Sequence, residues 1–394
     1  MSRTATSLIS ELPLLPSDPI YGMQILFKND PRPDKINLSI GVCRDEEQRT
    51  FFFKAVELAE AKLQEESPSY EYLPLTGLGT FCTHTKELVC KNRPSIIASQ
   101  TVGGTGALYV AARLLAAAHM HTVFVPEPTW TNHKPLFTRA GHDVFGYQYY
   151  DKTQGAIAFS KLCDAIRKMP ERSAIVIQAS CHNPTGIDLL PSHFHTISQL
   201  IKERKIYPIF DLAYQGLGDG LDEDVKGIHI FLDEGHELMV ATTFAKSFGL
   251  YNDRPGVLLI HTPDESHQRV VSHVQAIARS CYSSPPAHGA KIISMILADP
   301  RLKRLWEKEL QEYRDRLNSL RRLLHTAMSR HTIRFHYDHL LHTKGLFCLF
   351  NISEAEVLRL RNEHGLYLSL DGRISLSAIT KENVDRVAAA FATL

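Results

Sequence analysis

The chain has 394 residues, of which 44% are hydrophobic and 22% charged, proportions typical of a globular protein rather than a disordered or fibrous one. Its 44 basic and 43 acidic residues leave a formal net charge of +1, so no strong field would gather nucleic acid or an anionic membrane. No apolar run approaches the ~20 residues of a membrane span, and the N-terminus lacks the apolar core of a signal peptide. We expect a soluble protein, long enough for two domains, with no nucleic-acid or membrane partner.

The cysteines and histidines indicate no metal site. Seven cysteines are scattered along the chain and never form a CxxC pair, which favours free thiols in a reducing cytoplasm over disulfides or zinc. His336, His339 and His342 recur at steps of three, but no cysteine or carboxylate constellation accompanies them. We expect them to be surface or packed histidines.

The first predicted element is a segment with few residues suited to a hydrophobic core. The first 35 residues are rich in proline and aspartate and predict an extended arm. From about residue 50 to 300, short apolar runs alternate with helical patterns, which predicts an α/β domain with a mostly parallel sheet. The expected strands are 122–125, 174–177, 207–210, 238–242 and 257–260, and the clearest helices are 108–118 and 192–205.

A long helix is expected after Asp299-Pro300, because apolar residues recur at three- and four-residue steps as far as Leu324. A helix that bridges two domains is favoured over a coiled coil, since the repeat is short. Beyond it, apolar runs predict strands of a second, smaller sheet at 345–352, 366–370 and 374–377. Asp371-Gly372 is typical of a hairpin turn between the last two.

Two charged residues end predicted buried strands. Lys246 follows the apolar run 238–244, and Asp211 ends the run that begins at 207. Burial favours the neutral form of a lysine, which a Schiff base requires, and ligands of parallel sheets bind at the carboxyl ends of strands. An amine for an aldehyde and an acid for a pyridine nitrogen together indicate pyridoxal phosphate. The ordinary alternatives are a surface lysine and a helix N-cap for residues from Tyr214 onward.

Three further features fit the same cofactor. The glycine-rich run 103–106 precedes a predicted helix, whose free amides would bind a phosphate, although it matches neither a Walker A loop nor a dinucleotide fingerprint. Arg254 lies past a turn from Lys246 and offers a guanidinium to the same phosphate, and Trp130 offers a ring for stacking. The alternatives are a plain strand–helix turn, a loop charge paired with Asp253 and a core tryptophan.

Six runs of the sequence carry a family resemblance. From about Pro16 to the C-terminus, the chain resembles the aspartate/aromatic branch of the class I (fold type I) pyridoxal-phosphate aminotransferases. The runs are Gly103-Gly-Thr-Gly-Ala107, Cys181-His-Asn-Pro-Thr-Gly186, Phe210-Asp-Leu-Ala-Tyr-Gln-Gly216, Ala245-Lys-Ser-Phe-Gly-Leu-Tyr-Asn252, Tyr282-Ser-Ser-Pro-Pro-Ala-His-Gly289 and Asp371-Gly-Arg373.

The resemblance implies the fold class: a large domain with a mostly parallel sheet flanked by helices, and a smaller α+β domain built from both chain ends. The expected division is an N-terminal arm at 1–14, a small domain at 15–50 and 313–394, and a large cofactor-binding domain at 51–312. It also implies a homodimer with shared active sites.

The resemblance further implies catalytic roles. Lys246 would form the Schiff base and then move the proton between the substrate Cα and the cofactor C4′. Asp211 would keep the pyridine nitrogen protonated, Tyr214 and Asn183 would bind the phenolic oxygen, and Trp130 would stack on the ring.

Cofactor phosphate and substrate carboxylates are assigned in the same way. Gly104, Thr105, Thr243 and Arg254 would hold the phosphate, with Tyr72 reaching in from the partner subunit. For the substrate, Arg373 would grip the α-carboxylate as a bidentate fork. Arg279 would cross the dimer interface to the distal carboxylate, Trp130 and Asn183 would line the substrate site, and the segment at Gly41 would close over it.

This sequence departs from the family pattern at several positions. Gln178 stands where the family usually has a histidine behind the pyridinium aspartate. Thr243 replaces a serine, Cys43 a common tyrosine, and Pro255 an aliphatic residue. Ser284 occupies a position where many aspartate-selective members carry asparagine and aromatic-accepting members carry serine.

These features predict a cytoplasmic aspartate aminotransferase, which exchanges the amino group between L-aspartate and 2-oxoglutarate and gives oxaloacetate and L-glutamate. The nearest alternative is an aromatic (tyrosine/phenylalanine) aminotransferase that also accepts dicarboxylates, which Ser284 leaves open. Other pyridoxal-phosphate reactions, such as decarboxylation or β-elimination, and a non-catalytic regulator with the same fold are less favoured.

Overall fold

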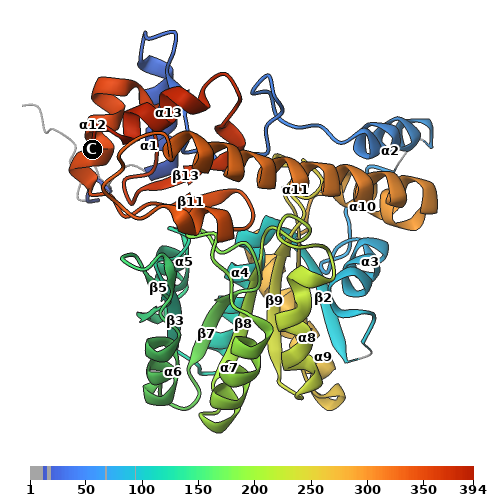
Figure 1. The fold of residues 1–394 in the computed structure, drawn as a ribbon. Helices are drawn as coiled ribbons and strands as arrows, with labels where there is room; N and C mark the ends of the chain where they lie inside the picture. Colours follow the sequence, from blue (N-terminus) through green and yellow to red (C-terminus); the bar gives the residue numbers. More distant parts are fainter. Residues whose placement is uncertain (1–11, 16–18, 67–68, 94) are drawn as a thin grey trace, which may run out of the picture.

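The computed structural model describes residues 12–15, 19–66, 69–93 and 95–394. A helix-flanked sheet forms one layer, and segments from both chain ends form a second layer against one end of that sheet (Figure 1). One long helix runs along the boundary between the two layers. No helix in these ranges is long and apolar enough to cross a membrane.

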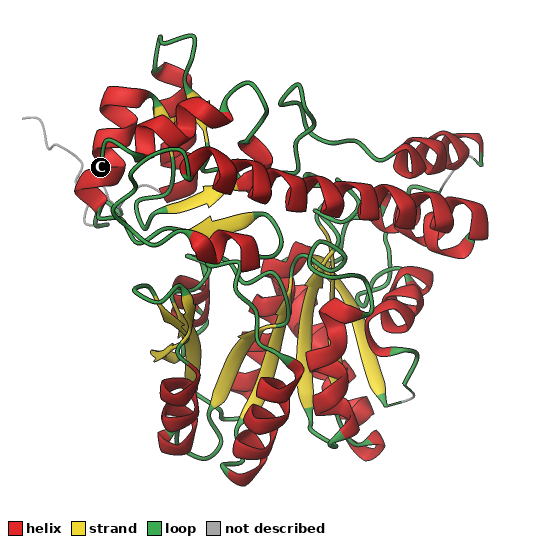
Figure 2. Cartoon of the chain, in the orientation of Figure 1, coloured by secondary structure: helices red, strands yellow, loops and turns green. Residues whose placement is uncertain are grey.

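The central sheet lies among helices (Figure 2). It has seven strands, and most neighbours are parallel, because only β10 (Pro255–His261) runs against its partners. Its spatial order is β2 (Ile96–Val102), β10 (Pro255–His261), β9 (Leu238–Thr243), β8 (Tyr207–Leu212), β7 (Ala174–Gln178), β3 (Thr122–Glu127) and β4 (Asp143–Gln148). Tyr150–Asp151 (β5) and Ala156–Ile157 (β6) form a separate small ladder.

Helices cover both faces of this sheet, which explains why its central strands are apolar on both sides. In β7, Ile175 and Ile177 pack into one core, while Ala174 and Val176 pack into the core on the opposite face. The flanking helices are α3 (Gly79–Cys90), α4 (Gly103–Ala117), α5 (His133–Arg139), α6 (Phe159–Lys168), α7 (Pro191–Glu203), α8 (Lys226–Asp233) and α9 (His267–Cys281). Helix α10 (His288–Ala298) packs instead on α3 and on the long helix at the boundary.

The second layer is a smaller α+β unit that joins the two ends of the chain. Strand β1 pairs in parallel with β12, and β11 pairs antiparallel with β13. Its elements, with the neighbouring α2, are α1 (Pro19–Asn29), β1 (Ile36–Asn37), α2 (Lys54–Glu65), β11 (Phe347–Leu349), α12 (Glu354–His364), β12 (Leu366–Tyr367), β13 (Arg373–Ser375) and α13 (Val384–Phe391). Single-turn 3₁₀ helices occur at Glu223–Val225, Asp264–Ser266, Asp338–His342 and Leu376–Ala378.

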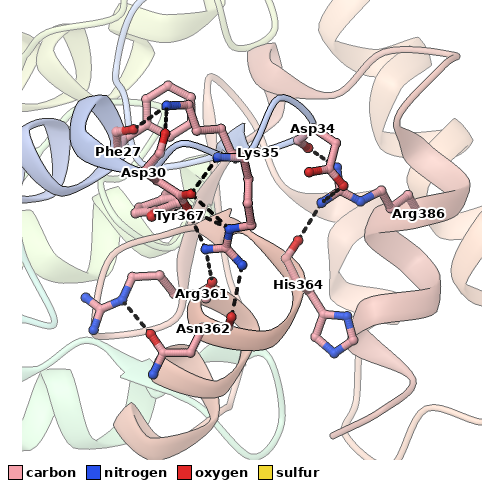
Figure 3. A network of polar contacts seen from close by, with 10 residues as sticks. Phe27, Asp30, Asp34, Lys35, Arg361, Asn362, His364, Tyr367 and Arg386 are labelled. Atoms are coloured by element: carbon pink, nitrogen blue, oxygen red, sulfur yellow. Dashed lines mark hydrogen bonds and ion pairs between the residues drawn. The ribbon is translucent and has the colours of Figure 1, made fainter.

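A polar network ties the N-terminal segment to the C-terminal helices (Figure 3). Arg32 pairs with Asp30 and donates to the carbonyls of Arg361 and Asn362, both at 2.9 Å. The Tyr367 hydroxyl donates to Asp30 Oδ2 at 2.6 Å. These hydrogen bonds hold the pKa of the Asp30 carboxyl well below its usual range. The network explains how the two chain ends form one unit.

Helix α11 (Pro300–Met328) confirms the predicted long helix. Asp299 caps its first turn by accepting from the Arg301 amide at 2.8 Å. Its apolar side, including Trp306, Leu310 and Leu317, is fully buried within the chain. That side therefore packs on this protein's own core, and the coiled-coil alternative is wrong.

Two expectations about the chain ends need correction. Residues 19–29 form α1 rather than an extended arm, because a proline at the first helical position gives up only an amide that has no partner within the helix. Leu12, Leu14 and Leu15 do expose most of their side chains, whereas 1–11 and 16–18 lie outside the described residues. The predicted hairpin is also wrong. Gly372 makes the turn with a φ of 91°, but β12 pairs with β1 and β13 pairs with β11, not with each other.

Candidate active site

A cavity of about 120 Å³ opens at the carboxyl ends of β7, β8 and β9. Chain segments far apart in sequence meet there, and many of the predicted site residues are among them. The lining residues are Gly104, Thr105, Leu108, Trp130, Gln178, Asn183, Asp211, Ala213, Tyr214, Thr243, Lys246 and Arg254.

Lys246 lies three residues beyond the end of β9 and points an amine at this cavity. Its Nζ lies 5.0 Å from the centre of the Tyr214 ring. Burial lowers the pKa of Lys246 to about 8, with the nearby Asp211 carboxylate opposing the shift and the Arg254 guanidinium adding to it. The residue is therefore a half-buried amine that loses its proton easily, and the surface-lysine alternative is wrong.

Asp211 lies in β8, where its backbone is in register with Gln178 of β7. Its Oδ2 is 3.1 Å from the ring Nε2 of His133, whose Nδ1 is 2.7 Å from the Thr129 hydroxyl. Turns, and no helix, follow Tyr214, so the helix-cap alternative for Asp211 is wrong. Histidine and hydroxyl together fix the orientation of the carboxylate.

His133 is the functional neighbour that sequence reasoning missed. It is fully buried, and its ring stands perpendicular to Trp130 with the centroids 5.3 Å apart. Its position three residues after Trp130 was the available signal, because the turn that joins them, in which the His133 amide donates to the Trp130 carbonyl at 2.9 Å, keeps the two residues close. Nothing local in the sequence shows that it reaches a carboxylate 78 positions away.

The N-terminus of α4 and Arg254 form a cradle of suitable size and charge for a phosphate. Gly103 has a φ of 66°, and a Cβ there would lie only 2.7 Å from the Arg254 Nη2. Across from Gly104, the Thr243 side chain lies 3.4 Å from the position of a Cβ. Free helix amides, the helix dipole and a guanidinium are the donors that bind a phosphate dianion. Arg254 Nη1 donates to the Tyr251 carbonyl at 2.8 Å and Asp253 binds His288 at 2.9 Å, so the alternative of a loop charge paired with Asp253 is wrong.

Arg373 brings a second guanidinium to Asn183. Its Nη1 donates to Asn183 Oδ1 at 3.0 Å, and its Nη2 donates to the Ser39 carbonyl at 2.9 Å. Its Nε is buried and has no acceptor among the described residues, and the guanidinium lies 4.2 Å above the Phe347 ring. A buried cation with donors to spare is suited to a carboxylate ligand. Gly41 packs on the same ring, since a Cβ there would lie 3.0 Å from Phe347 Cζ.

Four predicted site residues do not line the cavity of their own chain: Arg373 and Gly41, which lie beside Asn183 and Phe347, and Tyr72 and Arg279, which lie on the surface. Tyr72 exposes 95% of its surface. Arg279 is also exposed and donates to the Ser283 hydroxyl at 2.5 Å. Ser284 donates to the Leu73 carbonyl at 2.8 Å, so the segments that carry these two residues lie against each other on one surface.

Two other positions that depart from the family pattern, Cys43 and Pro255, and the histidine His339 make contacts that stabilise the fold. Cys43 is fully buried, its amide donates to the Tyr251 hydroxyl at 2.8 Å, and burial raises the pKa of its thiol to about 11. Pro255 begins β10, and its carbonyl accepts from the Thr243 hydroxyl at 3.0 Å. The ring Nε2 of His339 forms a hydrogen bond with the Leu349 carbonyl at 2.9 Å.

A fold of this kind, with a lysine, an aspartate and a phosphate cradle around one cavity, defines a cofactor-dependent transferase, and comparisons with known proteins narrow the class. The model of the family described as "Aminotransferase class I and II" matches residues 33–391. The chain therefore belongs to the class I and II aminotransferases, and the family resemblance is confirmed.

The relatives include enzymes named for two kinds of substrate. An aspartate aminotransferase from Pseudomonas aeruginosa is 37% identical over 98% of this chain and 99% of its own length. A tyrosine aminotransferase from Rhizobium meliloti is 39% identical over 96% of this chain and 97% of its own length. Among solved structures, the chain is similar to an aromatic-amino-acid aminotransferase from Burkholderia pseudomallei that is covalently bound to pyridoxal phosphate. The two superpose with a TM-score of 0.95 and are 34% identical, and the match covers 98% of this chain and 99% of that one.

Proposed function

We propose that the protein is an aspartate aminotransferase that uses pyridoxal 5′-phosphate to exchange the amino group between L-aspartate and 2-oxoglutarate. The observation that carries this proposal is the convergence of Lys246, Asp211 and Arg254 on one cavity, with Arg373 bound to Asn183 at its wall. An amine, an acid, a phosphate cradle and a carboxylate-binding guanidinium are the parts that amino transfer requires.

The cofactor, when bound, would supply an aldehyde carbon that carries the amino group between the two half-reactions and a pyridine ring that accepts electrons. Asp211, which is held by His133, would keep a proton on the ring nitrogen. Lys246 has a pKa of about 8, so near neutral pH it would both accept a proton from the substrate Cα and return one at the cofactor C4′. Tyr214 and Asn183 would hold the phenolic oxygen.

Arg373 would bind the α-carboxylate in every amino acid or 2-oxo acid that reacts. Its burial strengthens an ion pair with a carboxylate, because little water competes with it. Trp130 would stack on the ring and limit the width of the substrate site, and Gly41 would allow its segment to approach the substrate.

We also propose a homodimer in which each subunit completes the other's site. Tyr72 would reach the partner's phosphate cradle, and Arg279 would bind the distal carboxylate of the substrate in the partner's cavity. Exposure of both residues, and the contact between their segments through Ser284 and Leu73, support this arrangement. Cytoplasmic location fits the seven cysteines, all of which lie in the described residues and are unpaired.

The division into domains is proposed as an arm at 1–14, a small domain at 15–50 and 313–394, and a large domain at 51–312. Support comes from the polar network that joins Asp30 to Tyr367 and from the β1–β12 pairing, which unite the two chain ends. Helix α11 would carry the junction.

Preference for aromatic substrates is the second candidate, because Ser284 occupies the position where aromatic-accepting members carry serine and a relative is named tyrosine aminotransferase. The test is to titrate the cofactor-loaded protein with L-aspartate, L-tyrosine and L-phenylalanine and to follow its absorption spectrum without oxo acid. Conversion at a much lower concentration of aspartate supports the proposal. Equal or better conversion by the aromatic amino acids makes the protein an aromatic aminotransferase.

A further inference from the structure

Gln178 lines the cavity and has no role in the reaction described above. It is the last residue of β7 and exposes 6% of its surface. Because its backbone is in register with Asp211 in the neighbouring parallel strand, its side chain lies on the same face of the sheet as the Asp211 carboxylate.

Both polar atoms of the Gln178 amide bind the backbone of Asn183. Nε2 donates to the Asn183 carbonyl at 2.9 Å, and Oε1 accepts from the Asn183 amide at 2.8 Å. A flipped amide would place like groups against each other, so this pair of bonds permits one orientation only. The result is a two-point clamp on the residue whose side chain faces Arg373.

The clamp is one link in a polar chain across the floor of the cavity. Gln178 Nε2 also lies 3.5 Å from the Thr129 hydroxyl, at the long limit of a hydrogen bond. From there the contacts run through His133 to Asp211, and on the other side through Asn183 to Arg373. The successive distances are 3.1 Å for Asp211–His133, 2.7 Å for His133–Thr129 and 3.0 Å for Asn183–Arg373.

We propose that Gln178 is a positioning residue that sets substrate affinity by holding Asn183 against Arg373. The proposal rests on the proposed function, because it takes from it the role of Arg373 in binding the α-carboxylate. Without the clamp, the Asn183 amide turns, and the Arg373 guanidinium loses the acceptor that fixes its plane. The substrate carboxylate then meets a guanidinium that must be reoriented first, which weakens binding.

Gln178→Met tests the clamp, since it keeps the length of the side chain and removes both hydrogen bonds. We expect the KM for the amino acid and for the oxo acid to rise roughly tenfold, with kcat changed less than KM, as loss of uniform binding requires. The affinity for succinate, a dicarboxylate without an amino group, should fall by a similar factor in calorimetry of the cofactor-loaded protein.

Asn383→Leu is the matched control. The Asn383 amide likewise donates to a carbonyl, that of Ala378 at 2.9 Å, and accepts from a backbone amide, that of Thr380 at 2.9 Å, but it does not line the cavity. It should lower the thermal midpoint and leave KM and succinate affinity unchanged. An equal rise in KM in both variants would show a general loss of packing and overturn the proposal.

Gln178→Glu provides a pH readout that does not depend on the folding of the methionine variant. A charged carboxylate cannot donate to the Asn183 carbonyl, whereas a protonated carboxyl restores one donor and one acceptor. Succinate affinity relative to the wild type should therefore be low at high pH and recover as pH falls. A constant ratio across pH would contradict the clamp.

Arg373→Lys distinguishes a failure of the proposed function from a failure of the inference about Gln178. If this variant leaves succinate affinity unchanged, the proposed function is wrong about Arg373. If Arg373→Lys weakens binding while Gln178→Met binds succinate as the wild type does, the proposed function stands and the inference about Gln178 fails.

Discussion

Lys246 has a shifted pKa because three local effects compete around one amine. Burial favours the neutral form, the Arg254 guanidinium adds to this, and the Asp211 carboxylate favours the charged form. Burial is the largest effect, and the pKa falls from 10.5 to about 8. At neutral pH most of the amine is charged, but the neutral fraction is several hundred times larger than for an exposed lysine.

The pKa of Lys246 predicts how the cofactor-free protein captures pyridoxal phosphate. Only the neutral amine attacks an aldehyde, so the capture rate should rise with pH and level off above about 8. Stopped-flow absorption over a pH series measures the midpoint, and Lys246→Ala serves as the control without capture. A midpoint near 10.5, the value of an unperturbed lysine, would contradict the buried site.

The two proposed carboxylate-binding arginines should respond differently to substitution. Arg373→Lys removes a fork that every substrate uses, so kcat/KM should fall roughly 10- to 100-fold for aspartate and tyrosine alike. Arg279→Ala should lower kcat/KM for aspartate by a similar factor and leave tyrosine almost unaffected. Steady-state kinetics with both amino acids provides the comparison, and equal losses in the Arg279 variant would rule out its selective role.

At the residue scale, the sequence predicts charged residues that stand where an apolar residue is usual, such as the end of a buried strand. It does not predict contacts between residues that are far apart in the chain. Lys246 and Asp211 were predictable because each ends an apolar strand. His133 and the Gln178 clamp were not, since their partners depend on how strands align in the sheet. Tyr72 and Arg279 remain predictions, because one chain alone does not complete the proposed shared site.

At the scale of the elements, helix α11 links the second layer to the loop that carries Lys246. The link is made by one tryptophan. Trp306 is fully buried, stacks on Phe248 with centroids 4.4 Å apart, and donates its ring N–H to the Ser247 carbonyl at 2.7 Å. Ser247 follows Lys246 directly. The helix therefore supports the backbone that carries the proposed catalytic amine.

Trp306→Phe should lower the free energy of unfolding by about 1–3 kcal/mol, because the buried Ser247 carbonyl loses this donor. Urea unfolding followed by circular dichroism measures the change. A substitution at exposed Leu341, to Gln, is the control and should leave the unfolding midpoint unchanged. An unchanged midpoint in the Trp306 variant would show that the hydrogen bond adds no stability.

The central strands of the sheet were easier to predict from the sequence than the strands at its two edges. All five residues of β7 and all six of β9 are buried, so their apolar runs were clear. β2 carries buried polar residues, including Ser99 and Gln100, and β4 is an exposed edge strand with a central glycine, so both were missed. Pairing of β11 with β13 joins segments separated by α12, which a local turn signal cannot show.

On the scale of the whole molecule, the proposed shared sites predict complementation between a chain without the catalytic lysine and a chain that is impaired toward aspartate. In a mixed dimer of Lys246→Ala and Arg279→Ala subunits, one site has both substitutions and the other has neither. Equal mixing after dissociation should restore about a quarter of wild-type aspartate activity, since half of randomly paired dimers are mixed and each has one intact site. Activity that stays at the level of the separate variants would contradict an Arg279 that crosses the interface.

Attachment of the cofactor to Lys246 is the central claim, and reduction with borohydride followed by peptide mass mapping tests it most directly. The protein saturated with pyridoxal phosphate should carry the reduced cofactor on the peptide that contains Lys246, and prior addition of L-aspartate without oxo acid should remove this label. Labelling of a different lysine, or no labelling of the saturated protein, would contradict the account of the site.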